Sequence, residues 1–434
     1  MNKLNKLTII FIAVLLLTLP LLAACSDDDD DDETAATVAP TDEPTAPVTE
    51  LTAPVTEPFE DVKITIGNLS DMTGPASNSL ILVNSAMDDL VRYFNDENMI
   101  PGVELDIEHY DGQYNPANDK PGYEWLKDKG ADLIFAGLPN TPVTLKSFME
   151  EDEMLLFSLT AAQEVIDPPG WVFATNAPTA AYAKTLLKWI AENDWDWETN
   201  GPAKVGGAGW VGSYWQELGE GAEQYCDEHP EQFTWIGAQL NQYQQMWDTE
   251  VAALKDADYV FPPGAGMMSF IPAYRNSGAT AKFIGNDSHA PFFNYAAQAA
   301  GWDALDGWIF ALPNRWWNED AEIPNLAADL IEAYHPGKYE EFKGGGSSYI
   351  GPIGQLYGPL LILKETIERV GAENFTSQAF YETATSFSYT YGESEEWNYT
   401  DTKRTPWNSL GIYELSAADM DLVRADPEWQ PVIY

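Results

Sequence analysis

The feature that most constrains this chain is a regular alternation of short β-branched or apolar runs with amphipathic helical patterns. The run from Val62 to Leu69 is typical of a strand, and a helical pattern follows from about Leu80 to Asn98. Further strands are predicted at Val103–His109, Ala131–Ala136, Ala203–Gly207, Thr234–Leu240, Tyr259–Phe261 and Lys282–Gly285. Helices are predicted between them, at Pro121–Lys129, Leu145–Glu151, Thr179–Asn193, Tyr214–Glu228, Trp247–Leu254 and Met268–Ser277. Strands that alternate with helices indicate parallel sheets covered by helices on both faces.

The alternating part is too long for a single sheet. It runs to the end of a 434-residue chain, and single hydrophobic cores stop growing near roughly 250 to 300 residues. We therefore expect an α/β fold of two doubly wound lobes joined by a three-stranded hinge, with a long helix at Leu356–Val370 and an extended tail at Asn408–Leu415. The expected boundaries are 61–176 plus 312–390 for the first lobe and 177–311 plus 391–434 for the second. The crossings are expected near Ala174–Pro178, Gly307–Pro313 and 385–395.

The N-terminus predicts export. Lys3 and Lys6 precede an uncharged apolar run from Leu7 to Leu22, the pattern of a signal peptide. The run is interrupted by Pro20 and is shorter than the roughly 20 residues that span a bilayer. It ends in Leu-Ala-Ala-Cys25, which resembles the bacterial lipobox. We predict a signal peptide over residues 1–24, lipidation of Cys25 and attachment of the exported protein to the cell membrane.

An acidic, Pro- and Thr-rich tether is predicted over residues 25–60. It opens with the aspartate run Asp27–Asp32, and its composition cannot build a core. Like charges and prolines keep such a segment extended. It would therefore hold the folded part away from the membrane.

Charge and cysteine content exclude some classes of protein. The chain has 69 acidic and 22 basic residues and a formal net charge of −47, which repels nucleic acid. Of its two cysteines, Cys25 is consumed by lipidation, so Cys226 is expected to be an ordinary buried or half-buried thiol without a disulfide.

A resemblance to a known family rests on several motifs in a fixed order. They are Ile64-Thr-Ile-Gly with Asp71-Met-Thr-Gly, Asp89-Leu-Val-Arg-Tyr-Phe-Asn95 with Ile100-Pro-Gly102, Asp111 with Pro116-Ala117, Gly130-Ala-Asp-Leu-Ile134, Phe157-Ser158 and Val172-Phe173. Together they resemble the type I periplasmic solute-binding proteins of the branched-chain amino acid (Leu/Ile/Val-binding) importer family, over about Val62 to Leu415.

The resemblance implies a function in uptake. Proteins of this family hold a small ligand in the cleft between their lobes and deliver it to an ABC importer, so the implied partners are a permease, an ATPase and a small molecule, most simply an amino acid. No cofactor or metal and no enzymatic activity is implied. Delivery to a membrane sensor, and ligands of the amide, urea or organic acid type, remain open.

In the first lobe, two loops after predicted strands resemble the family's carboxylate-binding loops. Ligands of open α/β sheets bind at the carboxyl ends of strands, where helix N-termini attract anions. The residues concerned are Asn140 and Thr141 in one loop and Ser158, Thr160, Ala161 and Ala162 in the other. For Asn140 and Thr141 the alternative is capping of the following helix.

In the second lobe, the resemblance points to Tyr214, which would close over the ligand, and to Asp287, which would pair with a ligand ammonium group. The alternatives are a rim aromatic for Tyr214 and an Asx turn for Asp287.

The chain departs from the leucine-binding pattern in three places. Ser77 and its neighbours offer small polar groups where an aromatic wall is expected, the first lobe lacks a disulfide, and Pro262–Gly266 lacks a polar partner. Ser77 is therefore a candidate ligand contact, and leucine itself is disfavoured.

Other motifs favour structural roles. Gly207-Ala-Gly-Trp-Val-Gly212 matches the dinucleotide fingerprint, but the bulky Trp210 occupies the turn meant for pyrophosphate. The four histidines lie far apart in the sequence, which argues against a zinc site. Most tryptophans are expected in the core, among them Trp125, Trp189 and Trp247, whereas Trp210 stands next to the expected cleft.

Overall fold

The computed structural model describes residues 61–242, 244–391 and 395–434. Its first sheet is parallel throughout, with strand order β2-β1-β3-β4-β5. These strands are β1 (Val62–Ser70), β2 (Val103–Asp111), β3 (Ala131–Ala136), β4 (Leu156–Ser158) and β5 (Val172–Ala174). The predicted signal peptide, Cys25 and the tether lie outside the described residues.

The second sheet has the order β14-β13-β10-β9-β8-β6-β7, with β15 paired to β13. The pairs among β6 to β10 are parallel, and those of β13 with β10, β14 and β15 are antiparallel. The strands are β6 (Ala203–Trp210), β7 (Phe233–Asn241), β8 (Tyr259–Phe261), β9 (Lys282–Asn286), β10 (Ile309–Leu312), β13 (Ser409–Ser416), β14 (Asp421–Arg424) and β15 (Gln430–Pro431). A separate hairpin joins β11 (Ser388–Tyr391) and β12 (Glu395–Asn398).

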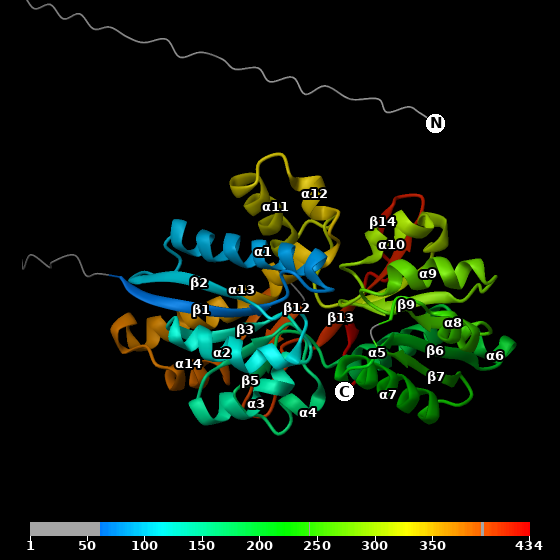
Figure 1. Cartoon of the computed structure of the whole chain (residues 1–434), viewed down its shortest axis with the longest axis horizontal. Helices are drawn as coiled ribbons and strands as arrows, with labels where there is room; N and C mark the ends of the chain where they lie inside the picture. Colours follow the sequence, from blue (N-terminus) through cyan, green and yellow to red (C-terminus); the bar gives the residue numbers. More distant parts are fainter. Residues whose placement is uncertain (1–60, 243, 392–394) are drawn as a thin grey trace, which may run out of the picture. The chain divides into compact units, whose positions relative to one another are not determined.

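Helices separate the strands, as the alternation predicts (Figure 1). Those of the first half are α1 (Ser77–Asp96), α2 (Asp119–Asp128), α3 (Thr141–Asp152), α4 (Gln163–Ile166), α5 (Thr179–Asn193), α6 (Trp197–Asn200) and α7 (Ser213–Glu228). The later ones are α8 (Asp248–Leu254), α9 (Met267–Asn276), α10 (Phe293–Ala300), α11 (Glu322–Tyr334), α12 (Tyr339–Lys343), α13 (Ser347–Val370) and α14 (Ser377–Ala384). The predicted α/β fold with parallel sheets is confirmed.

Each sheet packs against helices on both faces, and successive side chains of a strand point to opposite sides. In β3, Leu133 and Phe135 belong to the cluster that includes α1, whereas Ile134 and Ala136 pack with α2 and α3. In the second sheet, Ile309 and Ala311 of β10 face the cluster formed with α5 and α7, and Phe310 faces the opposite cluster. The apolar runs in the sequence therefore mark strands buried on both faces.

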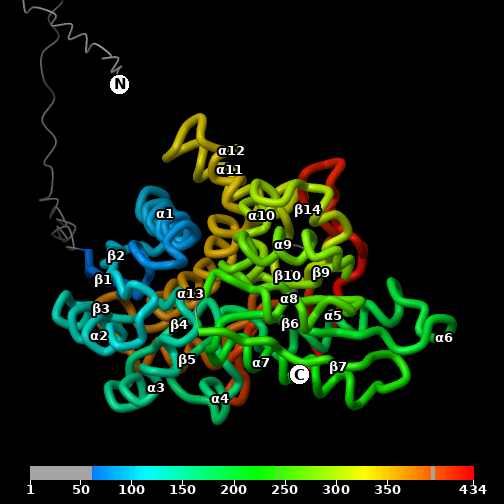
Figure 2. Tube along the Cα trace, turned by 45° about the vertical axis from the view of Figure 1, so that its right-hand side comes forward, coloured from blue at the N-terminus to red at the C-terminus, as the bar shows by residue number. Residues whose placement is uncertain are grey.

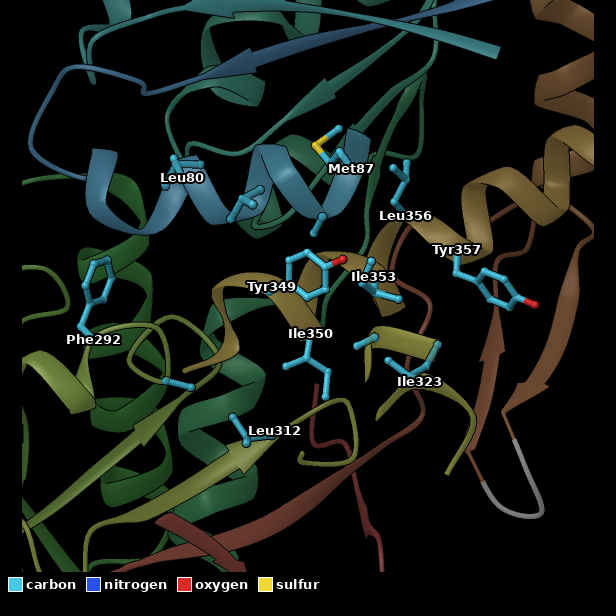
Figure 3. Packing of buried hydrophobic residues seen from close by; sticks show 14 of the residues in the cluster. Leu80, Met87, Phe292, Leu312, Ile323, Tyr349, Ile350, Ile353, Leu356 and Tyr357 are labelled. Carbon is cyan, nitrogen blue, oxygen red and sulfur yellow. The ribbon is translucent and has the colours of Figure 1, made fainter. Parts of the chain in front are cut away.

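Helix α13 comes late in the chain but packs against α1, next to the first sheet. Tyr349, Ile350, Ile353 and Leu356 of α13 lie beneath α1, which contributes Leu80 and Met87 to the same cluster (Figure 3). We call the first sheet with its helices the first lobe, and the second sheet with its helices the second lobe. The strands near the C-terminus return to the second sheet, among elements from the middle of the sequence (Figure 2).

The chain passes between the lobes after β5, after β10 and before β13. The first and third passages are held together by hydrogen bonds: Tyr399 donates to the carbonyl oxygen of Ala174 at 2.7 Å, and the Trp407 indole N–H donates to that of Thr175 at 3.0 Å. The second passage was expected near Gly307–Pro313. It begins only after Leu312, because Ile309–Leu312 forms β10 inside the second sheet. The exact lobe boundaries stay a prediction.

The interpretation of the tryptophans needs one correction. Trp189 and Trp247 are buried, but Trp125 is 36% exposed. Its ring lies on the surface of α2 beside Tyr110, with the Lys129 ammonium group 5.1 Å from the ring centroid. Trp125 is therefore a surface aromatic, and its prediction as a core residue is wrong. Cys226 is a buried free thiol, as expected.

Candidate functional site

A cleft opens where the carboxyl ends of strands from both lobes face each other. Its walls come from the start of α1 and the loops after β3 and β4 on one side, and from the loops after β6, β8 and β9 on the other. The segment after β10 and the first turns of α13 complete it. The space between the walls, counted to the open mouth, is about 1090 Å³. This is the usual place for a ligand in open α/β sheets.

Asp287 follows β9 and lines this cleft. Its Oδ2 atom accepts a hydrogen bond of 2.5 Å from the Asn176 side chain, which also donates to the carbonyl oxygen of Leu159 at 2.9 Å. Its Oδ1 atom is buried and has no hydrogen-bond partner among the described residues. Burial raises the pKa of Asp287 to about 7, although the nearby backbone amides of Ser288 and Asp287 and the nearby Tyr182 hydroxyl group favour the charged form. A buried acceptor without a donor is costly, so this oxygen is suited to receive a donor from a ligand.

Tyr214, at the start of α7, places its ring in the wall of the cleft. Its hydroxyl group donates to Oδ1 of Asn286 at 2.8 Å. The hydroxyl group is therefore engaged inside the second lobe, and the ring is the part that faces the cleft. Burial holds the pKa of Tyr214 well above its usual value, so the hydroxyl stays protonated.

His289 joins the loops after β8 and β9. Its Nδ1 accepts from the backbone N–H of Asn286 at 3.1 Å, so its Nε2–H donates to the carbonyl oxygen of Pro262 at 2.9 Å. The residue is fully buried, and burial lowers its pKa to about 4. The Trp215 ring, which lines the cleft, meets the imidazole edge to face with centroids 5.3 Å apart. His289 is thus a neutral structural residue that positions two walls of the cleft.

Thr160 lies opposite, in the loop after β4 of the first lobe. Its Oγ1 atom is buried without a hydrogen-bond partner in the described part of the chain. Its carbonyl oxygen accepts from the Ser158 hydroxyl group at 2.5 Å. The cleft therefore has unsatisfied side-chain oxygens in both lobes, Thr160 Oγ1 and Asp287 Oδ1.

The other predicted ligand residues do not line the cleft. Thr141 is buried and donates to Asp119 at 3.1 Å, and Ala161 and Ala162 are buried in apolar contacts. Ser77 is the first residue of α1, where Ala76 and Ser79 form the wall instead. For these residues and for Ser158, contact with a ligand stays a prediction.

Asn140 connects the two lobes. Its Oδ1 accepts a hydrogen bond from the Ser213 hydroxyl group of α7 at 3.3 Å, and its side chain makes no capping bond to α3. A second contact across the same gap joins Glu217 of α7 to the backbone N–H of Gln163 at 2.9 Å. The loop after β3 therefore lies against the second lobe beside Tyr214.

Two parts of the cleft wall were missed from the sequence. They are Leu312–Trp316, which is the end of β10 with the segment after it, and the first turns of α13, from Ser347 to Gln355. The glycines Gly344–Gly346 and Pro352 give the start of α13 the sequence pattern of a loop. The one tryptophan expected near the cleft, Trp210, does line it.

The glycine-rich stretch of β6 serves packing. Gly207 and Gly209 lie inside the strand, and a Cβ atom at Gly209 would stand 2.5 Å from the Trp215 ring. The Trp215 ring therefore packs directly against the backbone of Gly209. Among the described residues, no group of three or more His, Cys, Asp or Glu side chains has the geometry of a metal site. No helix in the described part of the chain is long and apolar enough to cross a membrane.

A family model described as periplasmic binding protein matches residues 63–419. A branched-chain amino acid ABC transporter protein from Thermus thermophilus with bound valine has a similar structure, with a TM-score of 0.74 and 18% identity over 86% of this chain and 97% of that one. A solute-binding protein from R. palustris in complex with 4-hydroxybenzoate gives 0.69 and 15%, over 85% and 97%. A fatty acid ABC transporter substrate-binding protein from Thermomonospora curvata gives 0.70 and 15%, over 86% and 92%. No curated protein matches the chain significantly in sequence.

Proposed function

Because the chain belongs to the periplasmic binding protein family, we propose that it captures a small solute between its two lobes outside the cytoplasm and delivers it to the permease and ATPase of an ABC importer. The cleft between the strand ends of both lobes supports this role. Hydrogen bonds join the two lobes beside the cleft, from Ser213 to Asn140 and from Gln163 to Glu217, so the walls of the cleft are held near each other. The signal peptide and lipidated Cys25 would place the protein at the outer face of the cell membrane.

We propose an α-amino acid, or a close relative of one, as the ligand. The observation that carries this choice is the buried Oδ1 of Asp287, which makes no hydrogen bond to a described residue although the Tyr182 hydroxyl group is near the carboxyl group. A ligand ammonium group would supply both a donor and the positive charge that restores ionisation of a carboxyl group with a raised pKa. Thr160 Oγ1 and the loop after β4 would receive the ligand carboxylate in the opposite lobe.

The neighbours by structure bind valine, 4-hydroxybenzoate or, by its description, fatty acids. The fold therefore accommodates zwitterions and simple acids, and the choice between them depends on this chain's own side chains. Asp287 favours a ligand with a positive charge, since a second carboxylate beside it would be repelled.

A thermal-shift screen of zwitterionic, amide and carboxylate compounds tests the proposal. We expect the stabilising compounds to be α-amino acids, and Asp287→Asn to weaken the best of them at least about 30-fold by calorimetry. The reason is that loss of one partner of a buried charge pair costs about 2 to 5 kcal/mol, and each 1.4 kcal/mol is about tenfold in affinity.

The matched control is Asp256→Asn, because Asp256 is exposed and does not line the cleft. It should bind like the unmodified protein. If only neutral amides or plain carboxylates stabilise the protein, or if Asp287→Asn binds amino acids normally, the assignment of ligand class and ammonium site is refuted.

A further inference from the structure

The end of the cleft formed by α13 contains a largely buried glutamine whose amide makes no hydrogen bond to a described residue. Gln355 is 5% exposed, lines the cleft and makes no side-chain hydrogen bond to a described residue. Asn314, in the segment after β10, also lines the cleft, and its buried Oδ1 has no partner there either. The two belong to the same end, because a Cβ atom at Gly354 would stand 2.6 Å from Asn314 Oδ1. This end therefore has a second polar set, separate from Asp287 and Thr160.

Helix α13 sets the distance between the two polar ends. Its first residue, Ser347, donates to the carbonyl oxygen of Asp287 at 3.5 Å. Gln355 follows eight positions later on the same helix, which at 1.5 Å per residue is about 12 Å along the axis. Long helical side chains lean toward the N-terminal end of their helix, so the Gln355 amide is nearer to Asp287 than its backbone is.

The walls between the two ends are apolar. Leu80 of α1, Phe292, Leu312 at the end of β10 and Ile350 of α13 surround this part of the cleft, and Figure 3 shows the four side chains carried by four different segments. Gly351 adds room, because a Cβ atom there would meet no atom closer than the Ser347 Cβ at 3.7 Å. It lies four residues before Gln355, hence on the same side of the helix.

We propose that this cleft selects an elongated amphipathic solute, with a polar head at Asp287 and Thr160, an apolar body along α13 and a distal hydrogen-bonding group received by Gln355 and Asn314. The identity of the head rests on the proposed function, whereas the body and the distal group do not. Gln355 is thereby a specificity-determining residue. An aromatic amino acid with a distal hydroxyl group is long enough to reach from Asp287 to Gln355 when a hydrogen bond of about 3 Å is added at each end.

The physical reason for selection is the state of the amide in the closed protein. In the open form, water entering by the mouth can satisfy Gln355. A ligand without a distal polar group displaces that water and leaves the amide unpaired, which is costly for a buried group. We expect this to lower affinity about 10-fold or more.

Calorimetry with two pairs of probes tests the inference. The pairs are tyrosine with phenylalanine, and 3-(4-hydroxyphenyl)propionate with 3-phenylpropionate; each pair differs in one hydroxyl group. We expect the hydroxylated member of the binding pair to bind about 10-fold tighter. Gln355→Met keeps a similar volume and a good helix former but removes the amide, and should bring the ratio of affinities close to one. The matched control is Gln224→Met on α7, where the glutamine is exposed, and it should leave the ratio unchanged.

A second variant tests the apolar body independently. Gly351→Leu should weaken every binding probe at least about 10-fold by filling the space, while circular dichroism and the melting temperature show an intact fold. If the leucine variant does not fold, Gly351→Ala, which relieves a helical glycine, serves the same purpose.

Equal affinities within both pairs, or a preference that persists in Gln355→Met, would overturn the inference, as would failure of all four probes to bind. If the propionates bind with the expected preference and the amino acids do not bind, the amino-acid proposal fails and the proposal of a distal site stands. If the amino acids bind but tyrosine and phenylalanine bind equally well, the amino-acid proposal stands and the proposal of a distal site fails.

Discussion

Replacing Asp287 by asparagine should stabilise the ligand-free protein at neutral and alkaline pH, although we expect it to weaken ligand binding. The pKa of this carboxyl group is about 7 in the folded protein against an ordinary value of 3.8, and the largest cause is burial. Each pKa unit corresponds to about 1.36 kcal/mol, so the full shift is worth on the order of 4 kcal/mol. An asparagine oxygen can still accept the bond from Asn176. We expect a gain of about 1 to 3 kcal/mol after partial relaxation of the charged site.

The sign of the pH dependence follows from linkage. Because the folded protein binds this proton more tightly than the unfolded chain, the contribution of Asp287 to stability is fully present below about pH 4 and is lost as the pH rises through about 7. Asparagine does not titrate. The stability difference between variant and unmodified protein should therefore be small at pH 4.5 and largest at pH 8.

Urea unfolding at both pH values measures this difference. The other carboxyl groups are common to both proteins and cancel, and the m-value should not change. Asp256→Asn, at an exposed position, should show no such gain. An equal gain in the free energy of unfolding at both pH values, or an asparagine variant that is less stable at pH 8, would refute the interpretation of Asp287 as a buried acid that lacks a charged partner.

Three further predictions concern other groups. The pKa of His289 is lowered to about 4 by burial, so its contribution to stability should be lost as the pH falls from about 6.5 to 4. The free energy of unfolding of His289→Gln, measured in urea, should therefore depend less steeply on pH in this window. The same pH dependence in both proteins would contradict a neutral, buried imidazole. Burial raises the pKa of the Cys226 thiol to about 12. In Cys25→Ser protein, Ellman's reagent should therefore react with Cys226 only after denaturant is added. Rapid labelling of the native protein would be inconsistent with burial of this thiol. Small-angle scattering should show a smaller radius of gyration at saturating ligand, because we expect the lobes to close by a hinge motion. An unchanged radius would contradict this closure.

The sequence predicted the layers of the fold well, because both sheets are buried on both faces. Short apolar runs such as Tyr259–Phe261 and helices such as Thr179–Asn193 agree with the structure to the residue. The prediction failed where local signals oppose tertiary packing. Helix α13 was expected only from Leu356, but it begins at Ser347, because packing against α1 overrides the glycines before it and Pro352 within it.

The same cause limited the prediction of the site. Thr160, Tyr214 and Asp287 follow strands or begin a helix, and the structure brings all three to one cleft. Gln355 and Leu312 gave no signal, since one lies on the unrecognised part of α13 and the other at the end of a buried strand. Their place in the cleft depends on contacts between segments far apart in the chain, which periodicity does not report. Trp125 shows the opposite error, since a helical position alone does not tell a core residue from a surface aromatic.

The interleaved course of the chain also bears on how such a protein reaches its compartment. The cover of the first sheet includes α13, which follows the last parallel strand of the second sheet, and the second sheet is completed only by β13 near the C-terminus. A chain that emerges N-terminus first thus exposes an incomplete first lobe until more than three quarters of its length has appeared. Neither lobe can complete its core early, so a nascent chain exported as proposed would remain unfolded enough to pass through a translocation pore, and the predicted signal peptide would act before a compact fold forms.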